Sequence, residues 1–162
     1  MRGDPSCPHS PRIVPPGDGP LIDVVGDRYR FLAVGEQTGG RYALWHATVM
    51  PGGGPPPHVH EREIENFYVL RGEITFVVEG RRIVAGPGTS AEMPIGVAHS
   101  FKNESSEVVE MLIQVAPAGL EKMFQRTGVI VTDPTTPIRP PSHEEIERLM
   151  KIAPEYGVRI LV

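Results

Sequence analysis

Residues 52–72 read GGGPPPHVHEREIENFYVLRG, and this stretch says most about the fold and about a candidate site. Glycines and prolines come first, then two histidines one residue apart, a run of acids, and an apolar segment. Alternate residues of an extended chain point to the same face, so His58 and His60 can bind one metal ion. Glu65 joins that face if the chain bends after His60, and residues 61–63 in that bend are expected to form a solvated rim. On its own, however, a pair of histidines on a strand is more often an ordinary surface feature.

Short segments rich in β-branched and aromatic residues lie on both sides of this stretch, each bounded by Gly or Pro. They are RYRFLAV (28–34), RYALWHATVM (41–50), IENFYVLRG (64–72), EITFVVEG (73–80), RRIVAG (81–86) and EVVEMLIQVAP (107–117). Strands spaced this closely, with turns about every 8–12 residues, predict an all-β sandwich or barrel.

Helical periodicity occurs only toward the end of the chain. Residues 118–128 and 142–157 both carry apolar residues at the spacing of an amphipathic helix. In the second segment Ser142 is the expected N-cap, and Glu145 three residues later completes a capping box. This helix could cover one mouth of the barrel or an edge strand, of which the second is the commoner role.

The chain is therefore expected to have three parts. Residues 1–20 are rich in Pro and Gly and predict a flexible arm. Residues 21–117 predict the β-barrel, and residues 118–162 a C-terminal helical extension that packs on it.

The composition, 162 residues with 40% hydrophobic and 22% charged residues, is typical of an ordinary globular domain. The net charge of -4 gives no reason to expect nucleic acid or an anionic membrane as a partner. No apolar run approaches the roughly 18 residues of a membrane span, and the N-terminus lacks the apolar core of a secretory signal. The only cysteine, Cys7, excludes an intrachain disulfide. We therefore expect a cytoplasmic protein.

A second stretch, MPIGVAHSFKN (93–103), supplies a further histidine. Pro94 and Gly96 predict a turn, after which His99 begins a strand. The alternatives are that the acids near residue 63 form a solvated charge run and that His99 is a core histidine with a local partner. Strand and turn signals around both stretches favour a shared metal site. The candidate ligands are His58, His60, Glu65 and His99, a set suited to one divalent Fe, Mn, Ni, Co, Zn or Cu ion.

The two stretches together resemble the cupin family, through two motifs that cover roughly residues 40–117. The first is Gly, five residues, His-x-His, three or four residues, Glu, six residues, Gly. The second is Gly, five residues, Pro-x-Gly, two residues, His, three residues, Asn. Every spacing is met, by Gly52, His58, His60, Glu65 and Gly72, and then by Gly88, Pro94, Gly96, His99 and Asn103. Fifteen residues separate the motifs, about the shortest gap the family uses.

The resemblance implies a cupin jelly-roll β-barrel with short C-terminal helices and one metal ion per chain. It implies that His58, His60, Glu65 and His99 are the metal ligands, and that Asn103 bonds the backbone. The flanking sequence looks like that of small single-domain cupins related to quercetin 2,3-dioxygenases. In that group the equivalent of Glu65 also takes a proton from the substrate hydroxyl, so Glu65 is the candidate catalytic base, with a raised pKa.

An apolar pocket is expected beside the ligands. With Glu65 pointing inward, period two also turns its strand neighbours inward. The candidate pocket residues are Phe67, Phe76, Met93, Phe101 and Met111, each of which is more often plain core. An apolar set argues against a sugar phosphate, which would need inward Lys or Arg, and favours a flat, apolar, chelating substrate.

Three functions remain open at this stage. They are a dioxygenase of the quercetinase type, another cupin enzyme such as an isomerase, decarboxylase or lyase, and a cupin that binds a small ligand without turnover. The strand signal over residues 21–34 suggests pairing between two copies, and we expect a homodimer with a small molecule as its other partner.

Overall fold

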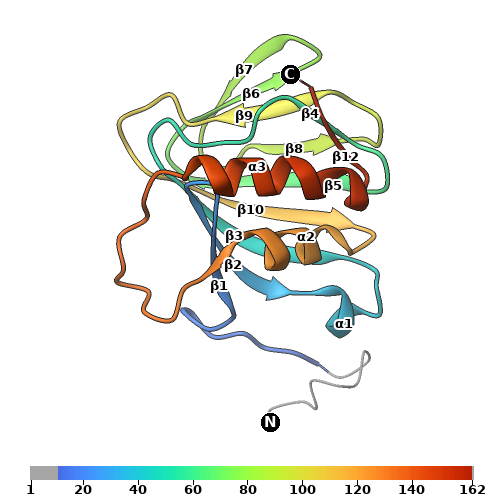
Figure 1. Ribbon diagram of the computed structural model, residues 1–162. Coiled ribbons are helices and arrows are strands. Elements are labelled where there is room, and N and C mark those ends of the chain that lie inside the picture. The colour runs from blue at the N-terminus through green and yellow to red at the C-terminus, as the bar shows by residue number, and fades with distance from the viewer. Residues whose placement is uncertain (1–10, 162) are drawn as a thin grey trace.

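The strands form two antiparallel sheets, which a computed structural model describes for residues 11–161 (Figure 1). The seven-stranded sheet runs in the order β11 (Val129–Ile130), β1 (Leu21–Val24), β2 (Asp27–Ala33), β3 (Ala43–Val49), β10 (Val109–Ala116), β5 (Ile64–Arg71), β8 (Ser90–Met93). The five-stranded sheet runs β12 (Val158–Ile160), β4 (His58–His60), β9 (His99–Lys102), β6 (Ile74–Val78), β7 (Arg81–Ala85). The prediction of a mostly β fold is confirmed.

The core lies between the inner faces of the sheets and follows strict alternation along the longest strands. On β10 the side chains of Val109, Met111, Ile113 and Val115 are buried, while the residues between them are half-buried. On β3 the same pattern buries Trp45 between two alanines. Burying one large apolar side chain stabilises the fold by about 1.5–3 kcal/mol, so these two strands anchor the large sheet.

Short helices complete the fold near the C-terminus, as predicted. They are α2 (Leu120–Thr127), α3 (His143–Ile152) and the 3₁₀ helix η1 (Ala153–Tyr156), and a further turn, α1 (Gly35–Thr38), follows β2. The expected capping box is present, since Ser142 Oγ accepts from the Glu145 amide at 3.2 Å. In return, Glu145 accepts from the Ser142 amide at 2.7 Å.

The C-terminal segment has both of the roles considered for it, since it covers a mouth of the barrel and also an edge strand. Leu149 of α3 and Ala153 of η1 line the internal cavity, so this part covers the mouth. The unexpected strand β12 covers the edge strand β4, with Val158 opposite His60. With three residues, β12 is too short to show an alternating pattern in the sequence. Figure 1 shows α3 in front of the strands β5 and β10, and β12 beside β4.

The division of the chain at residues 20 and 117 stays a prediction. Most of the predicted arm, residues 1–10, lies outside the described residues, and residues 11–20 contain no helix or strand. The homodimer also stays a prediction. Since β1 is already paired with both β2 and β11, an added strand would meet β11 instead of residues 21–34. Within residues 11–161 we find no helix long and apolar enough to cross a membrane.

Candidate metal centre

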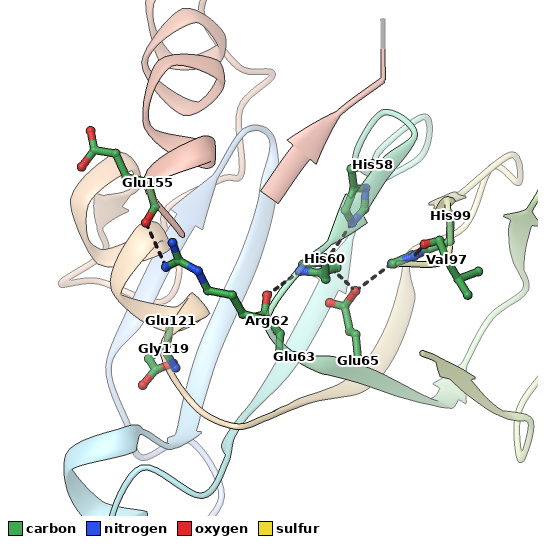
Figure 2. Close-up of polar contacts among 10 residues, drawn as sticks. All are labelled: His58, His60, Arg62, Glu63, Glu65, Val97, His99, Gly119, Glu121 and Glu155. Carbon is green, nitrogen blue, oxygen red and sulfur yellow. Dashed lines mark hydrogen bonds and ion pairs between the residues drawn. The ribbon is translucent and has the colours of Figure 1, made fainter. Parts of the chain in front are cut away.

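Three histidines and one glutamate meet on the inner faces of three strands (Figure 2). His58 and His60 lie on β4 and His99 begins β9, where the register sets it directly opposite His58. Glu65 comes from β5 of the other sheet. All four side chains are buried, and their potential ligand atoms lie within 4.8 Å of one another. The topology thus brings together all four candidate ligands.

The spacing of these atoms fits a single transition-metal ion. His60 Nε2 lies 3.1 Å from His58 Nε2 and 3.1 Å from Glu65 Oε2. His99 Nε2 lies 3.0 Å from the same Glu65 oxygen. Bonds of about 2.1 Å at right angles separate neighbouring ligands by about 3.0 Å. These three pairs of atoms therefore have the spacing of adjacent corners of a metal coordination shell.

Each imidazole is oriented by a partner at its other nitrogen. His58 Nδ1 lies 2.8 Å from the Pro56 carbonyl, and His99 Nδ1 lies 2.9 Å from the Val97 carbonyl. A carbonyl only accepts, so both rings donate from Nδ1 and keep the Nε2 lone pair for the cluster. Such outer partners fix the tautomer and the ring orientation of metal-binding histidines.

Glu63 orients His60 in the same way, which corrects our expectation for this residue. We expected Glu61, Arg62 and Glu63 to form a solvated rim. Glu61 and Arg62 are exposed, but Glu63 is only 4% exposed, and its carboxylate accepts from His60 Nδ1 at 2.6 Å. Glu63 lies two residues before Glu65, so the two side chains point to the same inner face of the extended chain. This alternation could have revealed that Glu63 is buried. Figure 2 shows Glu63 and Glu65 on the two sides of the His60 ring.

Without a metal ion, the carboxylates determine the charge of the cluster. Burial alone would lower the pKa of His60, but hydrogen bonds to Glu63 and Glu65 outweigh it and raise the pKa to about 10. Burial lowers the pKa of His58 to about 4. For Glu65, burial is outweighed by hydrogen bonds from His60 and His99, which lower its pKa instead of raising it as we expected. The cluster is therefore built to hold positive charge next to Glu65.

The loops that carry the two motifs are tied together by backbone contacts. The Gly52 amide donates to the Asn103 carbonyl at 2.7 Å, and the Asn103 amide donates to the Gly53 carbonyl at 3.0 Å. The buried Asn103 side chain donates to the carbonyls of Val49 and Glu107, so it bonds the backbone and does not point to the cluster. Gly54 has φ 119°, and a Cβ there would collide with the backbone of Phe101. These contacts hold His58 and His99 in register.

A cavity of about 90 Å³ opens beside the cluster. His58, His60 and Glu65 form part of its wall, and the remainder is mostly apolar and includes no Lys or Arg. Of the candidate pocket residues, only Phe101 lines this cavity. Phe67, Phe76, Met93 and Met111 are buried in the core and are not part of its lining.

The lining also contains residues that were not among the candidate pocket residues. They come from β1, β2, β3, β10, α2, α3, η1 and β12, which are spread over most of the chain. Asp27 and Tyr29 of β2 and Trp45 of β3 are the polar members of this group. Because their arrangement depends on the packing of both sheets with the C-terminal segment, no local sequence pattern predicts it.

Comparison with known proteins supports the same family. The model of the cupin domain matches residues 45–115. Quercetin 2,3-dioxygenase from Bacillus subtilis is 27% identical over 119 residues, covering 73% of this chain and 35% of the relative. The enzyme of the same name from Aspergillus japonicus is 29% identical over 127 residues, covering 72% of this chain and 35% of the relative. The chain thus spans about a third of the length of the curated relatives it matches.

Solved structures share the architecture. A structure described as a predicted oxalate decarboxylase from Thermotoga maritima superposes with a TM-score of 0.59 at 23% identity, covering 65% of this chain and 98% of that chain. At this identity the likeness concerns the fold alone. The two-sheet fold, the buried cluster and the matched motifs agree: this chain is a cupin domain protein, distantly related to quercetin 2,3-dioxygenases.

Proposed function

We propose that this protein is a metal-dependent dioxygenase of the quercetinase type that acts on a flat, apolar, enolisable substrate. One observation carries the proposal: Glu65 belongs to the ligand cluster and also lines an apolar cavity. A carboxylate in this position can contact a metal ion and a substrate hydroxyl at once. The distant relationship to quercetin 2,3-dioxygenases supports this reaction class.

The metal ion would be held by His58, His60, Glu65 and His99. When bound, it supplies a Lewis acid with positions left open for exogenous ligands. The outer partners of the three imidazoles hold each Nε2 atom facing the other ligands before any ion binds. Binding of the ion would displace the Nε2 proton of His60, whose pKa is raised by Glu63 and Glu65. Several divalent ions suit this ligand set, and geometry and supply choose among them.

Glu65 would act as the general base. Its lowered pKa keeps it ionised near neutral pH, so that it can accept a proton, and makes it a weaker base than the raised pKa we expected. Glu65 would take the proton of a substrate hydroxyl, and the enolate formed in this way is a group that O₂ can oxidise. Both oxygen atoms of O₂ enter the product of a dioxygenase, and the proton on Glu65 returns to it.

The cavity wall selects for apolar, uncharged substrates. Its lining offers no Lys or Arg to pair with a phosphate or a second carboxylate, which argues against sugar phosphates and dicarboxylates. A volume of about 90 Å³ has room for roughly six to nine water molecules. A compact molecule of one or two rings fits such a space best.

Oxygen uptake tests the proposal directly. Protein reconstituted separately with Fe, Mn, Co or Ni would be given 3-hydroxyflavone, 3-hydroxychromen-4-one and pentane-2,4-dione. We expect uptake with at least one pair of metal and substrate, and a loss of about 10²–10⁴-fold in Glu65→Gln. The matched control is Glu61→Gln, since Glu61 is exposed and pairs only loosely with Arg159. No uptake across the whole panel would rule out the dioxygenase.

The same experiment separates the alternatives. An isomerase, decarboxylase or lyase would use the same ligands without O₂, so turnover that persists under strict anaerobiosis would favour it. A binding cupin would retain a small molecule through purification and turn over nothing. Mass spectrometry of the released ligand would identify that case.

A further inference from the structure

The part of the cavity wall formed by β2 and β3 carries three polar side chains in apolar surroundings, namely Asp27, Tyr29 and Trp45, here called the β2–β3 wall. Asp27 and Tyr29 share the inner face of β2, and the Tyr29 ring lies 5.9 Å from the Trp45 ring. None of the three is a candidate metal ligand. Their presence in an otherwise apolar lining calls for a reason.

Trp45 carries the clearest unpaired hydrogen-bond donor. Its indole Nε1 is the one buried side-chain nitrogen or oxygen in the described part of the chain that has no hydrogen-bond partner. The side chain is 1% exposed, and leaving such a donor unpaired costs about 1–3 kcal/mol. The inward-facing neighbours of Trp45 on β3 are Ala43 and Ala47, which offer no acceptor. An occupant of the cavity can supply one.

Tyr29 offers a second donor. The side chain is buried and lines the cavity, so its hydroxyl is available to an occupant. Burial, together with the negative charges of Asp27 and Glu65, raises the pKa of Tyr29 well above its usual value. The phenol therefore keeps its proton and can donate it in a hydrogen bond.

Asp27 restricts which ligand groups can bind to these two donors. Its Oδ1 accepts from the Met50 amide at 3.2 Å, which holds the carboxyl against the loop before β4. Burial raises the pKa of Asp27 to about 7, against the opposing effect of the Met50 and Gly54 amides, so near neutral pH it is partly charged. With no Lys or Arg in the lining to offset it, the Asp27 carboxylate would repel a second anion at this wall.

We propose that the β2–β3 wall is a second recognition point, at which Trp45 Nε1–H and the Tyr29 hydroxyl donate to a neutral oxygen of the substrate. The substrate is then a one- or two-ring compound with a metal-chelating enol at one end and a hydroxyl or carbonyl oxygen, not a carboxylate, away from it. Only the metal-chelating end of this substrate rests on the proposed function. The alternative for Trp45 is an N–H contact with the face of Phe124, whose ring lies 5.5 Å away in a T-shaped arrangement.

The test uses zinc-loaded protein, in which no redox turnover intervenes. The probes are 3-hydroxychromen-4-one, its 6- and 7-hydroxy derivatives and its 7-carboxylate, and calorimetry measures each dissociation constant. We expect the better hydroxy derivative to bind about 10-fold more tightly than the parent, and the carboxylate more weakly than the parent. Trp45 is the only tryptophan, so its indole N–H gives a single NMR signal, which should move downfield only with the hydroxy probes.

Matched variants assign the effect to the wall. Trp45→Phe and Tyr29→Phe should each reduce the hydroxy preference to about 3-fold or less, with the parent probe still bound. Asp27→Asn should relax the discrimination against the carboxylate. The control is Tyr68→Phe, since Tyr68 is exposed on the outer face of β5. If a variant fails to fold, the indole signal of the unaltered protein still decides the question.

Three outcomes would overturn the inference. The first is equal affinity for the parent and both hydroxy probes. The second is a preference that survives in both Trp45→Phe and Tyr29→Phe. The third is an indole signal that no probe moves, which would assign the N–H to the Phe124 ring. Preference without oxygen uptake would refute only the dioxygenase, whereas failure of every probe to bind would refute both proposals.

Discussion

The two polar parts of the cavity wall differ in how their groups are satisfied. In the ligand cluster each imidazole has a partner at Nδ1, and each Nε2 lies near another ligand atom. On the β2–β3 wall, Trp45 Nε1 has no hydrogen-bond partner within the described part of the chain. The first region is complete without a substrate, and the second is not. This difference suggests that the cluster is organised for chemistry and the wall for selection.

The largest expected effect is the loss of metal binding when a ligand is removed. His99→Ala should weaken zinc affinity by at least about 1,000-fold, or about 4 kcal/mol, because it removes one of four ligands. Competition with a chromophoric chelator measures the dissociation constant. The control is His46→Ala, since His46 is half-buried on β3 and lies near Glu110, outside the cluster. Equal zinc affinity in both variants would remove His99 from the ligand set.

The next effect concerns pH and the β2–β3 wall. The pKa of Asp27 is about 7 in the folded protein, against 3.8 as its ordinary value. Between these values the folded state binds more protons than the unfolded state, so the free energy of unfolding decreases as pH rises from about 4 to 7 and then levels off. A shift of this size corresponds to about 4 kcal/mol, of which we expect about 2 kcal/mol to remain after local relaxation.

Asp27→Asn should abolish this component, making the variant gain stability relative to the parent by about 2 kcal/mol between pH 4.5 and pH 8. Urea unfolding of metal-free protein at several pH values gives the difference. Asp18→Asn, at an exposed position, is the control. Parallel pH profiles for the parent and Asp27→Asn would contradict the burial argument.

A smaller effect is expected for the carboxylate behind His60. Glu63→Gln keeps the shape of the side chain but removes the charge that orients and polarises the ring. Zinc affinity should fall about 10- to 100-fold, the usual result for such outer partners. Glu61→Gln serves as the comparison because Glu61 is exposed. If both substitutions leave affinity unchanged, His60 does not depend on Glu63 for its orientation.

The smallest expected effect concerns α3, which covers the cavity but supplies none of the candidate ligands. Ser142→Ala removes the N-cap of α3 and should destabilise that helix by about 1 kcal/mol. Since Leu149 of α3 lines the cavity, amide exchange in α3 should accelerate and probes should enter faster, while zinc affinity stays constant. Ser106→Ala, on an exposed loop, is the control. A change in zinc affinity would mean that the cover and the cluster are coupled.

The sequence predicted the cluster well because its information is local. Period two alone places His58 and His60 on one face of a strand. The place of His99 beside them was predicted from the pairing of the two stretches and their resemblance to the cupin motifs. Glu63 was misjudged because three neighbouring acids look like a solvated charge run, although its parity with Glu65 pointed inward.

The β2–β3 wall could not be predicted in the same way. Asp27 begins an apolar strand, and nothing near it in the chain shows that Gly54 and the loop before β4 will pack against it. The cover is similarly non-local, because β12 has only three residues and pairs with β4 about 100 positions earlier in the chain. Even the aromatic residues expected in the pocket were inward-facing core residues, with only Phe101 reaching the cavity.

The central claim is that His58, His60, Glu65 and His99 hold one metal ion. Crystals of untagged protein loaded with manganese or zinc, measured at the absorption edge of that metal, test it most directly. The account predicts one anomalous peak per chain, about 2.0–2.2 Å from the three Nε2 atoms and a Glu65 carboxylate oxygen. Full metal loading with the peak elsewhere, or with fewer than three of these four side chains within bonding distance, would contradict it.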